Sequence, residues 1–262
     1  MNYFKFIAQD VRELMAGLGV EKLTDLIGRT DLLEIIEGKT AKQRGLDLSR
    51  LLYAPKVPEG SARFCTQNNA PFDKGLLNKA IVEQAQQAFE SGGNADLSFD
   101  ISNLDRSVGA TLSGMIAQEY GSRGNAGQTF NIDLNGTAGQ SLGVWLAGGV
   151  NLNLTGDAND YVGKGMSGGR IVIKPHNGAA FKAEEATIAG NTCLYGATGG
   201  ELFASGRAGE RFGVRNSGAT TVVEGIGDNG CEYMTGGVVT VLGKTGINFG
   251  AGMTGEIGRA HV

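Results

Sequence analysis

The sequence predicts a mainly β fold, a parallel β-helix (a solenoid of stacked coils) preceded by a few α-helices. Glycine makes up 44 of the 262 residues, about 17% against the ~7% that is usual in proteins. Nine of these glycines lie in residues 1–108 and the other 35 in residues 109–262. Short apolar, β-branched segments lie between the glycines of the second stretch. They recur about every 20 residues, a period that is typical of a solenoid.

The composition is that of a folded, acidic protein. Hydrophobic residues make up 41% and charged residues 19%, which supplies a sizeable core and speaks against disorder. The net charge of -4 predicts neither a nucleic-acid nor an anionic-membrane partner. No apolar run is long enough to span a bilayer, and the first residues lack the layout of a signal peptide. The three cysteines are odd in number and far apart, which favours reduced thiols and a cytoplasmic location.

The first part of the chain is predicted to be helical and irregular. Apolar residues three or four apart predict an amphipathic helix over 3–18 and a second, short helix over 23–27. The polar and basic stretch 38–60 is expected to be a connector, and prolines keep residues 53–72 irregular. A third helix is predicted from about 74 to 90, closed by a serine and two glycines.

Glycines also set the phase of the repeat. They precede predicted strands that end in 150–154, 170–173, 201–203, 220–223 and 238–241, and successive repeats are 20, 31, 19, 18 and 19 residues apart. A loop at 176–180 explains the long interval. A glycine inside a strand costs about 0.5–1 kcal/mol against alanine, so these glycines are expected at corners with positive φ or where backbone packs on backbone. The repeat glycines are Gly148, Gly149, Gly163, Gly165, Gly168, Gly169, Gly196, Gly199, Gly200, Gly218, Gly236, Gly237, Gly250, Gly252 and Gly255.

Three stretches match the dinucleotide-binding pattern G-x-G-x-x-G, at 163–168, 225–230 and 250–255. That chemistry needs a helix directly after the glycines, so that a pyrophosphate can approach the helix N-terminus. Here the first two matches lead into extended segments, and the third stands near the end of the sequence. The stretches are therefore predicted to be structural corners, and no cofactor-binding residue is predicted.

Acidic and histidine residues are the candidates for metal or catalytic groups. Asp157, Asp160 and Asp228 could bind calcium or act on a sugar acid only if carboxylates were stacked on one exposed face. Successive turns do not repeat them, so a solvated surface is predicted. His176 and His261 lack partners at metal-ligand spacing. No metal site and no catalytic residue are predicted.

The remaining candidates also have structural interpretations. Cys65, Cys193 and Cys231 are predicted to be small buried hydrophobes. Ser113 and Ser217 are predicted to be turn residues, because neither lies in a G-x-S-x-G elbow. The basic stretch 39–44 is predicted to be a solvated linker, with a docking contact to a partner as the alternative.

Residues 103–114, Asn-Leu-Asp-Arg-Ser-Val-Gly-Ala-Thr-Leu-Ser-Gly, resemble the opening coil of the C-terminal domain of glutamate synthase large subunits. The glycine phases at 163–169, 196–200 and 250–255 resemble the G-x-G-x-G repeats of that domain. Residues 3–34 are similar to the segment that ends the family's flavin-binding barrel. The resemblance implies a right-handed β-helix that holds the amidotransferase and synthase domains in place.

The resemblance also implies a division of the chain. Residues 1–50 correspond to a helical segment and linker from the end of the barrel. Residues 51–95 form an irregular segment and a helix leading into the solenoid, and residues 96–262 form the glycine-rich β-helix. Family members convert glutamine, 2-oxoglutarate and a reductant to two glutamates. Their FMN and iron–sulfur cluster belong to other domains, so no cofactor is expected in this chain.

The fragment itself is therefore expected to be inactive. Its implied partners are the other domains of the large subunit and a small reductase subunit. Residues 256–262 break the pattern, and a cloning scar or a truncation is the hypothesis for them. One alternative is a β-helical subunit of another oxidoreductase such as formylmethanofuran dehydrogenase, against which the barrel-like helices at 3–34 weigh. A β-helical carbohydrate-active enzyme is disfavoured by the missing stack of acids and bases.

Overall fold

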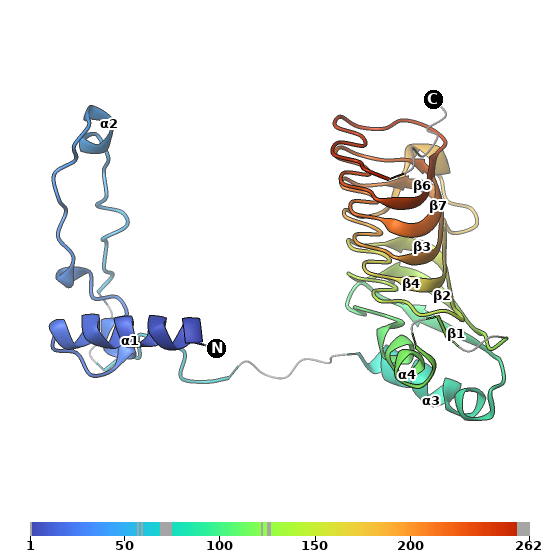
Figure 1. Cartoon of the computed structure of the whole chain (residues 1–262), viewed down its shortest axis with the longest axis horizontal. Helices are drawn as coiled ribbons and strands as arrows, with labels where there is room; N and C mark the ends of the chain where they lie inside the picture. The colour runs from blue at the N-terminus through green and yellow to red at the C-terminus, as the bar shows by residue number, and fades with distance from the viewer. Residues whose placement is uncertain are drawn as a thin grey trace. The chain divides into compact units, whose positions relative to one another are not determined.

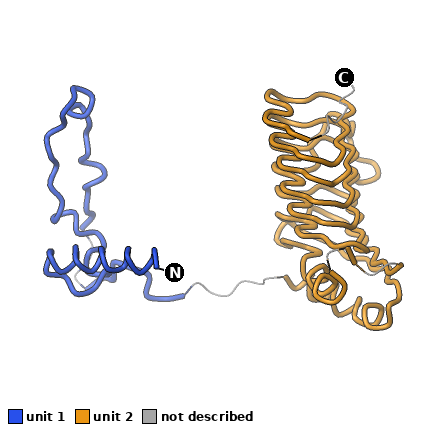
Figure 2. Tube along the Cα trace, viewed as in Figure 1, with its two compact units in different colours: residues 1–72 blue, residues 73–262 orange. Residues whose placement is uncertain are grey.

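The chain divides into two compact units, Met1–Phe72 and Asp73–Val262 (Figure 2). The boundary falls inside the segment 51–95 that the sequence sets between the helical part and the solenoid. The computed structural model describes residues 2–56, 58, 60–68, 75–121, 123–124 and 127–255. No helix among these residues combines the length and the apolar character that crossing a membrane requires.

The first unit contains short helices and extended segments. Its elements are α1 (Asn2–Gly17), η1 (Leu23–Leu26), η2 (Thr30–Leu32) and α2 (Ala41–Arg44). The two helices predicted over 3–18 and 23–27 are confirmed, with nearly those bounds. Helix α2 lies in the predicted connector, where Thr40 and Gln43 form a capping box that satisfies two backbone N–H groups at its start. None of the residues in these four elements is buried.

The second unit is a parallel sheet whose strands follow one another almost in chain order (Figure 1). The order is β1-β2-β3-β4-β6-β7-β8, and β5 pairs with β3 and β6. The prediction of a mainly β chain with parallel strands and a few helices is confirmed. The strands are β1 (Ala95–Ile101), β2 (Phe130–Ala138), β3 (Val150–Ala158), β4 (Ser167–Lys174), β5 (Thr187–Ala189), β6 (Gly199–Ala208), β7 (Ser217–Gly225) and β8 (Gly236–Val241).

The register of the sheet stacks like residues on like. Leu152 of β3 lies opposite Ile132 of β2 and Ile171 of β4, and all three are fully buried. Side chains alternate across a strand, so a shift of one residue would bring polar side chains into this core. Every side chain of the buried core belongs to the second unit. One core hydroxyl, that of Thr221, has no hydrogen-bond partner.

Helices α3 (Leu76–Ser91) and α4 (Ala110–Tyr120) lie at the β1 end of the sheet (Figure 1). Helix α3 confirms the third predicted helix, although the predicted start at 74 lies outside the described residues. The expectation of an opening coil through 103–114 is wrong in its second half, where α4 begins. Leu112 and Ile116, four residues apart, are buried on one face of α4. Both helices bury apolar side chains against the core and cover this end of the sheet.

Buried polar side chains attach α3 to the sheet. The side-chain amide of Asn78 donates to the carbonyl of Ser107 at 3.2 Å, and its oxygen accepts from the backbone N–H of Gly109 at 2.9 Å. At the other end of the helix, the Gln128 amide donates to the carbonyl of Ala88 at 2.9 Å. A buried polar group without a partner is destabilising, so these bonds specify where the helix packs.

Candidate functional site

The turns of the second unit share one backbone conformation. In six turns, the residues at positions i, i+2 and i+4 all have φ between 53° and 71°. These triplets are Ser141/Gly143/Trp145, Tyr161/Gly163/Gly165, Thr192/Leu194/Gly196, Arg211/Gly213/Arg215, Asn229/Cys231/Tyr233 and Asn248/Gly250/Gly252. Side chains seldom adopt this left-handed region. Eleven of the eighteen positions nevertheless carry a residue other than glycine, which is why glycine spacing alone does not show the motif.

Backbone hydrogen bonds join each turn to the next. Trp145 N–H donates to the carbonyl of Lys164 at 2.9 Å, and Gly165 N–H donates to the carbonyl of Tyr195 at 2.9 Å. The same bond recurs from Gly196, and the later turns continue the series. The turns therefore stack in register in the same order as the strands.

The fifteen repeat glycines occupy two kinds of position. Nine have positive φ: Gly149, Gly163, Gly165, Gly169, Gly196, Gly200, Gly237, Gly250 and Gly252. At the other six a Cβ would come within 3 Å of the backbone of the preceding repeat: Gly148, Gly168, Gly199, Gly218, Gly236 and Gly255. The glycines predicted to precede the strands lie inside them in β4, β6, β7 and β8. The pairing register shifts there, as at a β-bulge, which favours glycine.

The three dinucleotide-like stretches do not form a nucleotide site in the described residues. The matches at 163–168 and 250–255 contain the positive-φ residues of two turns, whereas 225–230 begins at the last residue of β7. Strand β4 follows the first match, and β8 is the next regular element after the second. Neither stretch leads into a helix N-terminus that could bind a pyrophosphate.

Two of the three candidate acids hold neighbouring turns together. Asp160 accepts the backbone N–H of Asn191 at 2.7 Å, and Asp228 accepts that of Ile247 at 2.9 Å. Each acid directly precedes the first positive-φ residue of its turn. Both are half-buried, so the predicted solvated surface is correct only for Asp157, which is exposed. Asp160 and Asp228 occupy the same position of two repeats, a relation that the sequence pattern of glycines does not reveal.

The cysteines differ in their surroundings. Cys193 and Cys231 are buried, as predicted, and burial raises the pKa of each thiol to about 12. Both are neutral near pH 7 and are poor nucleophiles. The prediction of burial is wrong for Cys65, which is exposed because the first unit has no core to receive it.

Neither candidate serine is a turn residue. Ser113 lies within α4, where its buried hydroxyl accepts the backbone N–H of Ala147 at 3.2 Å. Ser217 is the first residue of β7, and its hydroxyl donates to the carbonyl of Ala197 at 3.2 Å. His176 is exposed after β4, and His261 lies outside the described residues. No three His, Cys, Asp or Glu side chains of the described residues form a group that could hold a metal ion.

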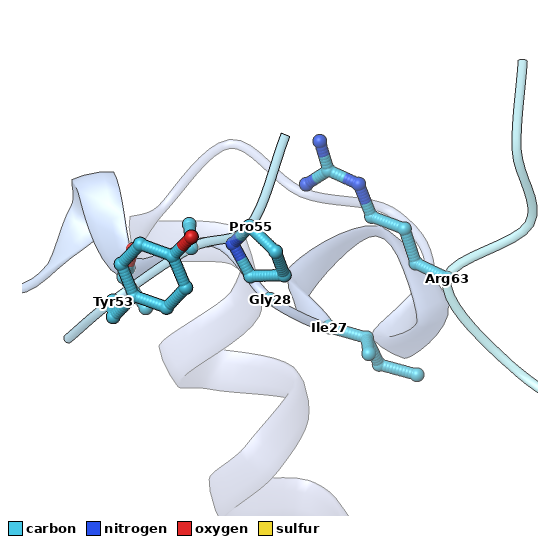
Figure 3. Close-up of a pocket in the computed structure, with 7 residues that line it drawn as sticks. Ile27, Gly28, Tyr53, Pro55 and Arg63 are labelled. Atoms are coloured by element: carbon cyan, nitrogen blue, oxygen red, sulfur yellow. The ribbon is translucent and has the colours of Figure 1, made fainter. Parts of the chain in front are cut away.

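The first unit contains a hollow between two of its segments (Figure 3). Tyr53 and Pro55 line it from one segment, Ile27 from the other, and Arg63 brings the only charge among the lining residues. The basic stretch 39–44 is exposed. A hollow with a single charged side chain has no pair of groups for acid–base or nucleophilic chemistry.

Residues 78–262 match the family model described as the GXGXG motif. The chain belongs to this family. It is 49% identical over 259 residues to ferredoxin-dependent glutamate synthase 2, chloroplastic, of Arabidopsis thaliana, and 48% identical over 259 residues to the glutamate synthase [NADPH] large chain of Bacillus subtilis. It is 46% identical over 258 residues to the glutamate synthase [NADH] of Schizosaccharomyces pombe.

These alignments cover 98% of the chain but only 12–17% of each relative. The chain thus corresponds to about a sixth or less of the length of these proteins. Both units are included in the match, so the helical first unit has a counterpart in the relatives as well. None of these three relatives is named as a formylmethanofuran dehydrogenase or a carbohydrate-active enzyme, as the alternative interpretations require.

Proposed function

We propose that this chain is a non-catalytic scaffold domain of a glutamate synthase large subunit, folded as a right-handed parallel β-helix. In the parent enzyme, which converts glutamine, 2-oxoglutarate and a reductant to two glutamates, it holds the amidotransferase and synthase domains in place. The observation that carries the proposal is the match of 98% of the chain to one segment of much longer glutamate synthases.

The repeated turns support the β-helical part of the proposal. Strand pairs and turn-to-turn hydrogen bonds both recur in chain order, as expected when each repeat forms one coil of a solenoid. Connections between parallel strands of one sheet are right-handed in about 98% of cases, which supports the handedness. The repeat glycines then form the corners of the coils.

The relatives' names support a role apart from the redox chemistry. They specify ferredoxin, NADPH and NADH, yet the identity to this chain is similar, 46–49%. A segment that contacted the reductant would be expected to differ among the three. The proposal therefore places FMN and the iron–sulfur cluster in domains outside this chain. Its partners are those domains and a small reductase subunit, in the cytoplasm.

A chimeric enzyme tests the proposal. The matching segment of the Bacillus subtilis large chain is replaced by this chain, and glutamine-dependent glutamate formation is measured with a deletion of the segment in parallel. We expect the chimera to be active and the deletion to lose coupled activity. A chimera with Gly156→Ala, which disturbs the coil and changes no exposed polar group, is the matched control and should behave like the deletion.

Two results would contradict the scaffold role. One is coupled activity at the parental level in the deletion variant. The other is stoichiometric flavin on this chain purified by itself, which we expect to be colourless and without glutaminase activity.

A further inference from the structure

Aromatic and basic side chains gather on the outer side of the stacked turns. Trp145 is 67% exposed and Tyr233 58% exposed, and Arg211 and Arg215 are also exposed. In each triplet the residues at i+1 and i+2 face the core, whereas those at i, i+3 and i+4 face outward. We call the set Trp145, Tyr161, Lys164, Arg211, Arg215 and Tyr233 the turn edge.

Five of these six side chains sit on strained backbone. Trp145, Tyr161, Arg211, Arg215 and Tyr233 have φ between 53° and 65°. A bulky residue in the left-handed region is unfavourable, and such residues concentrate at functional sites. Glycine occupies the same positions in neighbouring turns, so the fold does not require a large side chain there.

The hydrogen-bond series places the turn edge along one line. The residues at i+4 run Trp145, Gly165, Gly196, Arg215 and Tyr233, one to each successive turn. With about 4.8 Å between neighbouring chains of a sheet, the indole and the Arg215 guanidinium are three steps, roughly 14 Å, apart. The Trp145 ring lies over Gly165, where a Cβ would come within 2.9 Å of it, but a Cβ at Gly196 would meet no atom within 4 Å. Backbone is therefore exposed between Trp145 and Arg215.

The charge of the turn edge is opposite to that of the chain. Its cations are Lys164, Arg211 and Arg215, and Glu232 is the one acid among the outward i, i+3 and i+4 positions, in a chain of net charge -4. Among the described residues, no carboxylate forms an ion pair with any of the three cations. Lys164 instead lies over the ring of Tyr161, 5.2 Å from its centroid.

We propose that the turn edge docks an acidic, carboxylate-bearing surface of a neighbouring protein domain. Trp, Tyr and Arg are the residues that dominate binding energy at protein interfaces, and unpaired cations between aromatic rings recognise carboxylates. The inference rests on the proposed scaffold function, because it names the face by which the scaffold holds a neighbour and the chemistry of that neighbour.

A nucleic acid fits this unit less well than a protein. Three cations along the edge would neutralise few phosphates. The exposed face of β1 and β2 carries Asp96, Asp100 and Asp133, which would repel a polyanion that extended beyond the edge. A compact acidic protein surface can contact the edge alone.

The test uses Trp145, the single tryptophan of the chain, as a fluorescent reporter. The whole chain is titrated with a poly-L-glutamate peptide of about 20 residues at low salt, where electrostatic binding is strongest. We expect a saturable change in tryptophan emission that weakens as salt is raised. The double variant Arg211→Gln, Arg215→Gln should weaken binding about tenfold or more, since each hydrogen-bonded charge pair contributes appreciably.

The matched control is Arg170→Gln, Lys174→Gln, which removes two cations from β4 and should leave binding unchanged. Circular dichroism checks that each variant is folded, and Arg211→Lys, Arg215→Lys, which keeps the charge, should retain most of the binding. If the glutamine variants fail to fold, Lys164→Gln and the salt dependence of the unchanged chain decide the matter.

Several outcomes would overturn the proposal. They are an emission that poly-L-glutamate does not alter, equal weakening by the β4 control, tighter binding of a 20-nucleotide oligothymidine, or an emission change that sedimentation traces to self-association. The outcome is separable from the scaffold test. An active chimera with no poly-L-glutamate binding removes only the docking edge, whereas binding by a chain whose chimera is inactive removes the scaffold role.

Discussion

Helices α1 and α3 have the same length, 16 residues, and each carries an apolar stripe, yet their surroundings are opposite. Helix α3 buries Ile81 and Ala85 completely, and Asn78 fixes one of its ends to the sheet. Helix α1 buries nothing, and Phe4 and Leu14 on its apolar side are 74% and 70% exposed. Apolar periodicity predicts that a helix forms, but it does not say what the helix packs against.

The same difference separates the two units. All residues of the buried core belong to the second unit, which therefore has the means to fold cooperatively by itself. The first unit presents large apolar side chains to its surroundings. Exposed apolar surface of this extent is typical of an interaction site, in keeping with a chain that matches about a sixth of longer proteins.

Two glycine substitutions should separate the units most strongly. Gly156 has φ 147°, and a Cβ there would overlap the carbonyl oxygen of Gly136, so Gly156→Ala should lower the free energy of unfolding by about 4 kcal/mol or more. Gly17, at the end of α1, has nothing within 4 Å, and Gly17→Ala should change it by less than about 0.5 kcal/mol. Urea unfolding followed by circular dichroism measures both. Similar losses in the two variants would contradict a chain stabilised by its second unit.

A pair of apolar truncations tests the two helices directly. Ile81→Ala leaves a cavity in the core and should lower the free energy of unfolding by about 2–5 kcal/mol. Leu14→Ala removes an exposed side chain and should change it by less than about 0.5 kcal/mol. The same urea titration is the measurement. A loss of several kcal/mol for Leu14→Ala would show that α1 packs within the chain.

The thiols give the smallest and most local contrast. Cys65 in the first unit should react with a disulfide reagent at pH 8 in the folded chain, and Cys193 and Cys231 only on unfolding, because burial excludes the reagent and raises the pKa of both thiols to about 12. Counting the thiols released before and after denaturant checks this. Rapid reaction of all three in the folded chain would contradict it.

The same pKa values predict a dependence of stability on pH. Burial raises the pKa of both thiols from an ordinary value of 9.0 to about 12 in the folded chain. Their contribution to stability is present below about pH 9 and is lost as the pH rises toward 12, since the unfolded chain releases these protons first. The double variant Cys193→Ala, Cys231→Ala should show a smaller decline over that range, measured by urea unfolding at a series of pH values.

Much of the fold follows from local pattern. The spacings of 20, 31, 19, 18 and 19 residues that the glycines show are also those between the first residues of the triplets, from Ser141 to Asn248. Alternating side chains predict the strands, because a half-buried strand has a period of two. Helix α4 escapes prediction because its flanking Gly109 and Gly121 resemble the glycines of a coil corner.

Spacing along the chain is enough to specify the helices of the first unit, the strands and their period. The folded molecule was needed to show which helix is buried, why Cys65 differs from Cys193, and where the acids bond. It also placed Trp145 and four other large side chains in a conformation that favours glycine. Spacing could not predict this, because the hydrogen bonds of neighbouring repeats impose one turn conformation, whatever side chain a given repeat brings to it.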